Sequence, residues 1–149
     1  MKVLLYYVGK ARDPHANAMA EEFVKRSTRY AKCEMREVVP TRFDPWSKHP
    51  SAAKVLLDPA GKRLDSAQFA GLVLEAERDA HDLIFLVGGA EGLPGVWREK
   101  GGRENTARHS GDLLLSLSAM TLPHELARVV LAEQIYRAFT LLRGHPYPK

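Results

Sequence analysis

The sequence predicts an α/β domain with a mostly parallel sheet that helices cover on both faces. Short apolar runs of β-prone residues alternate along the chain with segments whose apolar residues recur at helical spacing. These runs are largely continuous in their apolar character, which is typical of strands that are buried on both faces. The 149 residues contain no internal repeat and are enough for one core, so we expect a single domain over residues 1–149.

The first half of the chain contains two strand signals and one helix signal. Residues 2–8 are an apolar run that Gly9 ends, and they predict the first strand. Residues 16–31 place apolar side chains on one face and charged side chains on the other, which predicts an amphipathic helix. Residues 34–39 predict a weaker strand, and the proline-rich residues 40–52 predict an irregular loop.

The middle of the chain repeats this alternation. Residues 54–57 predict a short strand, and the Asp-Pro-Ala-Gly sequence over 58–61 predicts a turn after it. Asp65 and Gln68 have the spacing of a capping box, which predicts the start of a helix. Residues 83–87 are the clearest buried strand, and two glycines follow it.

The last third of the chain ends in a long helix. Residues 90–108 predict a loop with a short helix, residues 113–115 a strand, and residues 116–122 another loop. Pro123 suits the first turn of a helix that we expect to continue to about Leu142.

Charge and cysteine content indicate a cytoplasmic setting. The chain carries 22 Lys and Arg against 18 Asp and Glu, a net charge of +4 that is compatible with a nucleic-acid partner without requiring one. Cys33 is the single cysteine and cannot form an internal disulfide, which favours a reducing compartment. No apolar stretch approaches the roughly 20 residues of a membrane helix, so we expect no membrane association.

The expected ligand-binding edge lies at the carboxyl ends of the strands, as in other open α/β sheets. Three predicted strands end there, at Leu57, Val87 and Leu115. The glycines at 88, 89 and 92 allow the backbone to approach a ligand closely, although a Gly-Gly pair after a strand is also a common tight turn. Neither the dinucleotide-binding fingerprint nor the Walker pattern is present.

The last helix is apolar around nearly its whole circumference, which predicts burial on more than one side. The sheet can cover one side, and a second copy of the chain is a natural cover for another. Arg128 projects from an apolar sector, while Glu133 and Arg137 are four residues apart. In one interpretation Glu133 and Arg137 form an ion pair and the Arg128 side chain extends along apolar surface to reach solvent. In the other, Arg128 or Arg137 contacts a partner subunit or a phosphate.

Metal and nucleophile chemistry find little support. The six histidines show no ligand spacing and one cysteine cannot build a zinc site, so we expect no metal. No Gly-x-Ser-x-Gly elbow accompanies Ser116, Ser118 and His124, which argues against a hydrolase. Basic residues are spread through 25–32 and 98–108, and each group alone is more often a solvated face than a nucleic-acid footprint.

Five segments taken together resemble one known family. They are Val8-Gly9-Lys10, Leu86-Val87-Gly88-Gly89-Ala90-Glu91-Gly92-Leu93, the run Leu-Ser-Leu-Ser-Ala-Met-Thr-Leu-Pro-His over 115–124, and Arg128 to Phe139 with the ending Arg143-Gly144-His145-Pro146-Tyr147. In this order they resemble the ribosomal RNA large-subunit methyltransferase H family, of the SPOUT class of knotted methyltransferases. The resemblance covers nearly the whole chain, and the 115–124 segment with the Glu-Gln-x-Tyr-Arg helix is its most specific part.

The resemblance implies a function, a cofactor and an assembly. It implies S-adenosylmethionine-dependent methylation of N3 of a pseudouridine in 23S ribosomal RNA on assembled ribosomes, by a homodimer with a C-terminal trefoil knot. The family's cofactor positions correspond to Leu57, Gly88, Leu117, Ser118, Ala119, Met120, Thr121 and Leu122. These positions fall at the three strand ends identified above.

We expect the tail and two arginines to act on the RNA. His145 and Tyr147 are candidates to contact the target nucleotide, and Arg128 or Arg137 to hold a phosphate or stabilise charge on the base. The tail could instead simply pack against the last helix. Relatives commonly have His where Pro148 stands, and a longer segment with a helix around residues 40–54. The alternatives are a knotted methyltransferase of another RNA such as tRNA, and a non-catalytic RNA-binding module.

Overall fold

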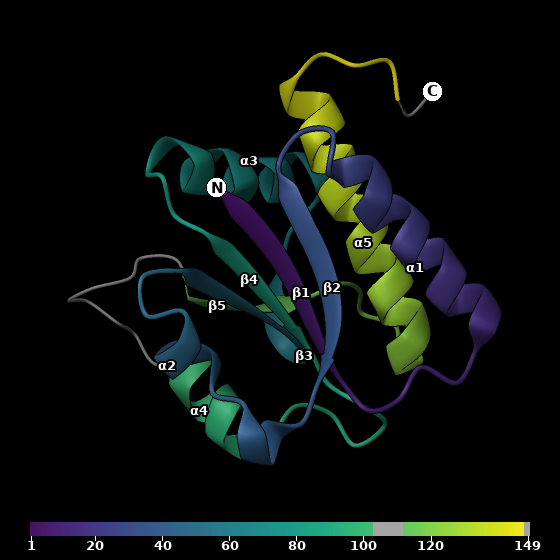
Figure 1. Ribbon diagram of the computed structural model, residues 1–149, viewed down its shortest axis with the longest axis vertical. Helices are drawn as coiled ribbons and strands as arrows, with labels where there is room; N and C mark the ends of the chain where they lie inside the picture. The colour runs from purple at the N-terminus through teal and green to yellow at the C-terminus, as the bar shows by residue number, and fades with distance from the viewer. Residues whose placement is uncertain (103–111, 148–149) are drawn as a thin grey trace.

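Five parallel strands form one sheet in the order β2-β1-β4-β3-β5, in a computed structural model that describes residues 1–102 and 112–147 (Figure 1). The predicted parallel α/β fold is therefore confirmed. The strands are β1 (Lys2–Val8), β2 (Lys32–Val38), β3 (Ala53–Arg63), β4 (Leu83–Val87) and β5 (Leu113–Ser116). The helices are α1 (Pro14–Ser27), η1 (a 3₁₀ turn, Pro40–Arg42), α2 (Pro45–Lys48), α3 (Ser66–Arg78), α4 (Gly95–Gly102) and α5 (His124–Leu142).

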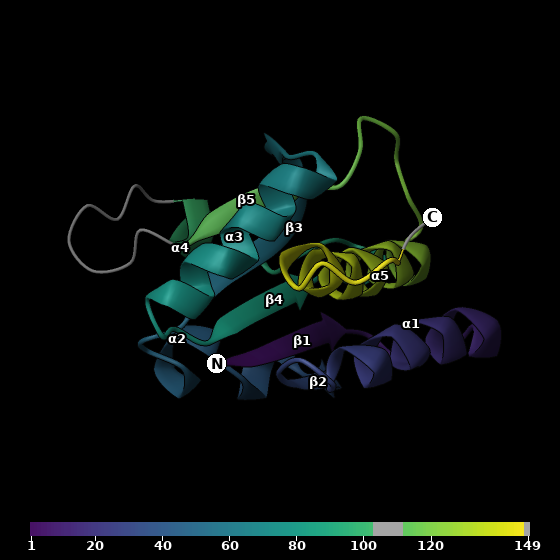
Figure 2. The same cartoon turned by 90° about the horizontal axis from the view of Figure 1, so that it is seen from above.

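Helices cover both faces of the sheet, as the two views in Figures 1 and 2 show. Because successive strand residues point to opposite faces, β1 sends Leu5 toward α1, α3 and α5 and Leu4 toward the α4 side. The first core also contains Phe85 and Phe139, and the second contains Trp97. Among the described residues, no helix is long and apolar enough to cross a membrane.

Capping side chains set the first turns of α1 and α3. The Asp65 carboxylate accepts a hydrogen bond from the backbone N–H of Gln68, whose side chain accepts one from the Asp65 N–H, so the predicted capping box is confirmed. Asp13 caps α1 in a similar way through the N–H groups of His15 and Ala16. This cap starts α1 two residues before the predicted residue 16, and the helix ends at Ser27 rather than at residue 31.

The predicted irregular loop over 40–52 is wrong in part, because it contains η1 and α2. Both begin with a proline, whose fixed φ suits the first helical position and whose missing N–H costs nothing there. The Asp44 carboxylate accepts a hydrogen bond from the N–H of Trp46 and caps α2. The prolines that suggested irregular backbone instead begin short helices.

Strand β3 is longer than predicted, because it continues from Ala53 to Arg63 through residues 58–61, where the sequence predicted a turn. Leu115 of β5 pairs with both Leu57 and Lys62, so the four residues between form a bulge that leaves the ladder. A Cβ on Gly61 would lie 2.6 Å from the carbonyl carbon of Leu114. A side chain at this position would therefore push the bulge away from β5.

Helix α5 lies between α1 and α3, which supply much of the cover that we expected from a second chain (Figure 2). Its buried residues include Leu131, Ile135 and Phe139. Leu126 and Leu141 remain exposed on its outer side. Burial of α5 therefore does not by itself require a partner.

Lys54 is buried beneath the α2–α4 side of the sheet, with none of its side chain accessible. Its Nζ has no hydrogen-bond partner among the described residues, although its backbone N–H donates to Asp112 at 3.0 Å. Burial lowers the pKa of Lys54, and the nearby carboxylates of Asp112 and Asp44 offset this only in part. The ammonium group therefore destabilises the folded state while it is charged.

We predict that Lys54→Met raises the free energy of unfolding at pH 7 by about 1–3 kcal/mol, because it removes an unsatisfied buried charge. The folded pKa lies below the unfolded value of 10.5, so the wild type gains stability as the pH rises through this window. The gain from Lys54→Met should shrink accordingly toward pH 10.5. Urea unfolding at several pH values measures it, with Lys62→Met at an exposed position of β3 as the control. A loss of stability at pH 7 would contradict the prediction.

Candidate functional site

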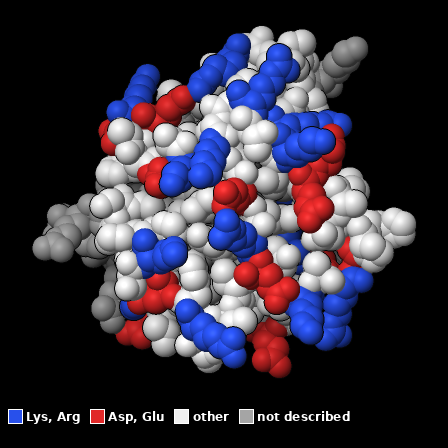
Figure 3. Space-filling model, viewed as in Figure 1, with Lys and Arg blue, Asp and Glu red and all other residues white. Residues whose placement is uncertain are grey.

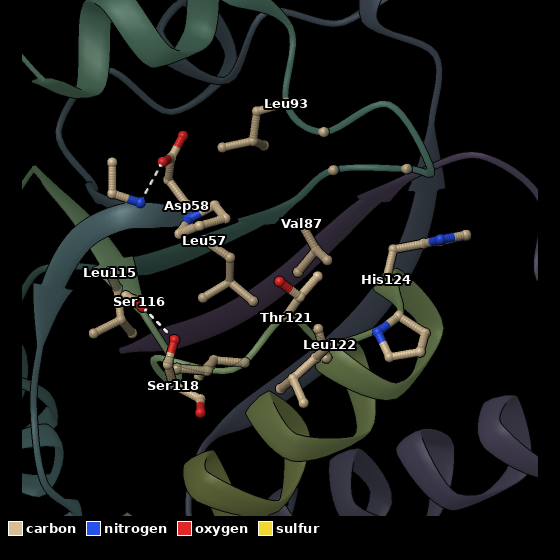
Figure 4. Close-up of a pocket in the computed structure, with 18 of the residues that line it drawn as sticks. Leu57, Asp58, Val87, Leu93, Leu115, Ser116, Ser118, Thr121, Leu122 and His124 are labelled. Carbon is tan, nitrogen blue, oxygen red and sulfur yellow. Dashed lines mark hydrogen bonds between the residues drawn. The ribbon is translucent and has the colours of Figure 1, made fainter.

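The carboxyl ends of β3, β4 and β5 surround a pocket of about 830 Å³. This volume falls within the ~300–1,000 Å³ range of small-molecule and cofactor sites. Figure 4 shows Leu57, Thr121 and Leu122 pointing into one open space from different segments of the chain. The pocket thus lies at the edge where the sequence predicted ligand binding.

Gly88 and Gly92 give the loop after β4 its shape. The Gly92 N–H donates to the Gly89 carbonyl at 2.9 Å, and Gly92 has a φ of +84°, which favours glycine. A Cβ on Gly88 would lie 2.3 Å from the Gly92 carbonyl carbon and 2.5 Å from the Leu93 nitrogen. The loop therefore folds back against its own first residue and presents backbone to the pocket.

Two serines hold the loop after β5. The Ser116 hydroxyl donates to the Ser118 carbonyl at 2.9 Å, as Figure 4 shows, and the Ser118 hydroxyl accepts from the Met120 N–H at 2.9 Å. Seven of the eight predicted cofactor positions line the pocket, and Ala119 is the exception. The seven are Leu57, Gly88, Leu117, Ser118, Met120, Thr121 and Leu122.

One ion pair between a buried carboxylate and a half-exposed arginine lies on the α4 side of the pocket. Asp58 is 7% exposed, and its two oxygens accept hydrogen bonds from the Ala60 N–H at 2.8 Å and the Arg98 Nε at 2.5 Å. Sequence reasoning missed this pair because the two residues are 40 positions apart and each belongs to a segment with an ordinary solvated pattern. Arg98 belongs to the basic residues of 98–108 noted in the sequence, and the other two arginines of that segment, Arg103 and Arg108, lie outside the described residues.

The surroundings of the pocket fit a cofactor that carries a nucleoside. Apolar side chains from Leu57, Val87 and Leu122 can enclose a flat ring, while loop backbone can hydrogen-bond to its edge. At Gly88 the loop packs so closely on its own backbone that a side chain would displace it. S-adenosylmethionine, which the family resemblance implies, has this chemistry.

The tail docks on the outer face of α5, around Glu133. The Tyr147 hydroxyl donates to Glu133 Oε2 at 2.6 Å, and the Arg137 guanidinium donates to the same oxygen at 2.7 Å. We call Glu133, Arg137 and Tyr147 the tail cluster. The predicted Glu133–Arg137 ion pair is therefore present, and Tyr147 completes it.

The tail cluster shifts the pKa values of its members in opposite directions. Burial and the hydrogen bond to Glu133 raise the pKa of Tyr147 to about 12. Burial alone would raise the pKa of Glu133, but hydrogen bonds from Arg137 and Tyr147 outweigh it and lower the pKa. At neutral pH Tyr147 is therefore a hydrogen-bond donor and Glu133 is an ionised acceptor.

The tail cluster lies away from the pocket of the same chain. Ala127 is the last residue of α5 in the pocket lining, and Glu133 and Arg137 lie six and ten residues further along, about 9 and 15 Å at 1.5 Å per residue. His145 accepts a hydrogen bond from the Tyr147 N–H at 3.2 Å and helps to fold the tail back. Within one chain, Arg137, His145 and Tyr147 are thus grouped together but are not brought to the cofactor positions. Pro148 lies outside the described residues.

Arg128 is in the core, with 2% of its surface exposed. Its Cζ lies 3.7 Å from the centroid of the Tyr7 ring, and one terminal nitrogen lies 3.7 Å from Glu125 Oε1. Glu125 in turn accepts hydrogen bonds from the N–H groups of Arg12 and Asp13. Arg128 therefore joins α5 to the β1–α1 connection, and it does not reach the surface where RNA phosphate or a partner could meet it.

Comparison with known proteins identifies similar chains. A family model described as a predicted SPOUT methyltransferase matches residues 1–148. The chain is 56% identical over 147 residues to the ribosomal RNA large subunit methyltransferase H of Solibacter usitatus, covering 99% of both chains. It is 40% identical over 155 residues to a protein of that name from Thermus thermophilus, covering 99% of this chain and 98% of the relative.

A solved structure supports the fold. The crystal structure of a probable methyltransferase from Bordetella pertussis Tohama I superposes with a TM-score of 0.56 at 14% sequence identity. The match covers 92% of this chain and 93% of that one, so the two share an architecture along nearly their full length.

We predict that Gly88→Ala weakens S-adenosylmethionine binding at least tenfold, because the added methyl group must displace the Gly92–Leu93 backbone. Titration calorimetry measures the affinity, and circular dichroism verifies the fold. The control is Gly71→Ala on α3, where an added Cβ meets nothing within 4 Å. Equal affinities for the two variants would show that the loop after β4 does not contact the cofactor.

Proposed function

Because this chain belongs to the SPOUT methyltransferase family, we propose that it transfers a methyl group from S-adenosylmethionine to large-subunit ribosomal RNA. The observation that carries the proposal is full-length similarity, at 56% identity, to a protein named for this reaction. The pocket at the three strand ends supports it, because it contains the positions where the family resemblance expects the cofactor.

We assign cofactor binding to the three loops around the pocket. The backbone of Leu117–Leu122 and Gly88 would hold the adenosine, with apolar contact from Leu57. When bound, S-adenosylmethionine supplies a methyl group on a positively charged sulfur, which a nitrogen nucleophile can take directly. The C-terminal trefoil knot stays a prediction of the family resemblance.

The proposed target is N3 of a pseudouridine in 23S ribosomal RNA on assembled ribosomes in the cytoplasm. N3 must lose its proton and lie about 3–3.5 Å from the methyl carbon. The pKa of Tyr147, raised to about 12, makes this residue a poor base at neutral pH. Tyr147 would instead donate a hydrogen bond or hold Glu133 in place. The protein would therefore contribute chiefly by positioning the target pseudouridine.

We further propose that the active form is a homodimer in which one chain's tail completes its partner's pocket. Arg137 lies ten residues along α5 beyond the pocket-lining Ala127, about 15 Å at 1.5 Å per residue, and Tyr147 is bound beside it at Glu133, so the tail is held away from a nucleotide that enters the pocket of its own chain. A two-fold dimer repeats each contact and would place each chain's tail at the pocket of its partner. The exposed outer residues Leu126 and Leu141 of α5 offer apolar area for such a contact.

We predict that the protein labels large-subunit RNA when it is incubated with ribosomes that lack this methyl group and with methyl-labelled S-adenosylmethionine. Free 23S RNA should be labelled less, because the folded ribosome presents the target in one conformation. Nucleoside mass spectrometry identifies the product as N3-methylpseudouridine.

The control is transfer RNA under the same conditions. Labelling confined to transfer RNA would assign the chain to another RNA substrate and overturn the proposal. Cofactor binding without labelling of any RNA would indicate a non-catalytic RNA-binding module.

A further inference from the structure

We propose that Arg98 and Arg63 form a phosphate clamp at the rim of the pocket, with Asp58 holding Arg98 in place. The clamp would bind a backbone phosphate of the substrate RNA next to the target nucleotide. This inference rests on the proposed function, because it assumes that an RNA strand enters the pocket.

Asp58 fixes one side of the Arg98 guanidinium. Asp58 is nearly buried and is held by the Ala60 N–H, so its carboxylate has a set position in the bulge over residues 58–61. It accepts a hydrogen bond from Arg98 Nε at 2.5 Å, whereas 51% of the Arg98 side chain is exposed. A guanidinium anchored at Nε keeps its two terminal nitrogens for a second anion, and their planar fork matches two oxygens of a phosphate.

Arg63 lies on the same side of the sheet as Arg98. It pairs with Ser116 in the β3–β5 ladder, and Ser116 lines the pocket. Leu115 faces the α3–α5 side, so its neighbour Ser116, and Arg63 opposite it, face the α4 side. Helix α4 carries Arg98 on that side. Two arginines from separate elements therefore lie on the α4 side of the sheet, with Arg98 in the lining of the pocket and Arg63 opposite the pocket-lining Ser116.

The pocket lining carries the two carboxylates Asp58 and Glu91, so binding of RNA there would depend on individually placed arginines rather than on net positive charge. Among the described residues that line the pocket, Arg98 is the only Lys or Arg. On the face drawn in Figure 3, basic and acidic side chains are interspersed, so the attraction for RNA on that face is not concentrated in one region. With a net charge of only +4 per chain, a few placed arginines would have to position the RNA.

A phosphate fits the exposed position of Arg98 better than the carboxylate of the cofactor does. The predicted cofactor positions lie on Leu57, Gly88 and the Leu117–Leu122 loop, whereas Arg98 comes from α4 and is half exposed to solvent. An arginine that binds a phosphate of an RNA strand entering from solvent is expected at the exposed edge of the pocket, where Arg98 lies. The cofactor carboxylate remains the competing ligand, and the experiment separates the two.

The test compares Arg98→Gln, Arg63→Gln and the control Arg36→Gln. Arg36 lies on β2 at the opposite edge of the sheet, where it is exposed and forms an ion pair with Glu34 at 3.1 Å, so the control also removes a paired arginine. The KM for large ribosomal subunits is measured at several KCl concentrations. The affinity for S-adenosylhomocysteine, which keeps the carboxylate, is measured by calorimetry.

We expect Arg98→Gln to raise the KM about tenfold and Arg63→Gln to raise it several-fold, with kcat and S-adenosylhomocysteine affinity close to wild type. The slope of log KM against log salt should fall by about 0.7–1 for each lost phosphate contact. Arg98→Lys keeps the positive charge but loses the two planar terminal nitrogens of the guanidinium. Its salt dependence of KM should therefore equal that of the wild type, while its KM should lie between those of the wild type and Arg98→Gln.

Two results would overturn the phosphate clamp. One is a KM and a salt slope for Arg98→Gln that equal those of Arg36→Gln. The other is a tenfold loss of S-adenosylhomocysteine affinity, which would assign Arg98 to the cofactor carboxylate. If the wild type transfers no methyl group, the proposed function fails separately, and binding of the same variants to large subunits in a sedimentation assay still decides the clamp.

Discussion

The fixed length of α5 determines how the site can be assembled. The first turn of this helix lines the pocket as far as Ala127, and Glu133 and Arg137 of the tail cluster lie six and ten residues further along its outer face. Packing between α1 and α3 and against the sheet leaves the helix little freedom to bend, since Leu131 and Phe139 are fully buried. The distance between pocket and tail cluster is therefore a property of the fold. For this reason we propose that the active site draws the pocket and the tail from two chains.

Backbone rather than side-chain chemistry shapes the pocket. At Gly88 the loop after β4 folds tightly on itself, and at Gly61 the bulge of β3 packs against β5, so that a Cβ at either position would collide with backbone. Residues of β3, of the loop after β4 and of the serine-held loop after β5 line the same pocket. Loop backbone with unspent donors and acceptors can recognise a nucleoside without a charged side chain. This explains why no catalytic triad or metal-ligand spacing marks the site in the sequence.

Local signals predicted the strands, the capping box at Asp65 and the position of the pocket, because each depends on residues close together in the chain. Long-range contacts were not predictable in this way. Asp58 meets Arg98 across 40 residues, and Arg128 stacks on Tyr7 across the domain. Helical periodicity placed Arg128 in an apolar sector, but nothing local indicated that an aromatic ring would cover it. Tyr147 reaches Glu133 only because the tail reverses direction after α5.

Mixing two inactive variants tests the two-chain site most directly. Gly88→Ala disables the pocket and Tyr147→Ala disables the tail, and each alone should transfer little methyl to ribosomes. After the two are unfolded together in equal amounts and refolded, about half of the dimers would be mixed, and each would hold one pocket and one tail without a substitution. We expect recovery of about a quarter of wild-type activity. If pocket and tail act within one chain, every site carries a substitution, and activity that stays at the level of the separate variants would show that no site is shared between two chains.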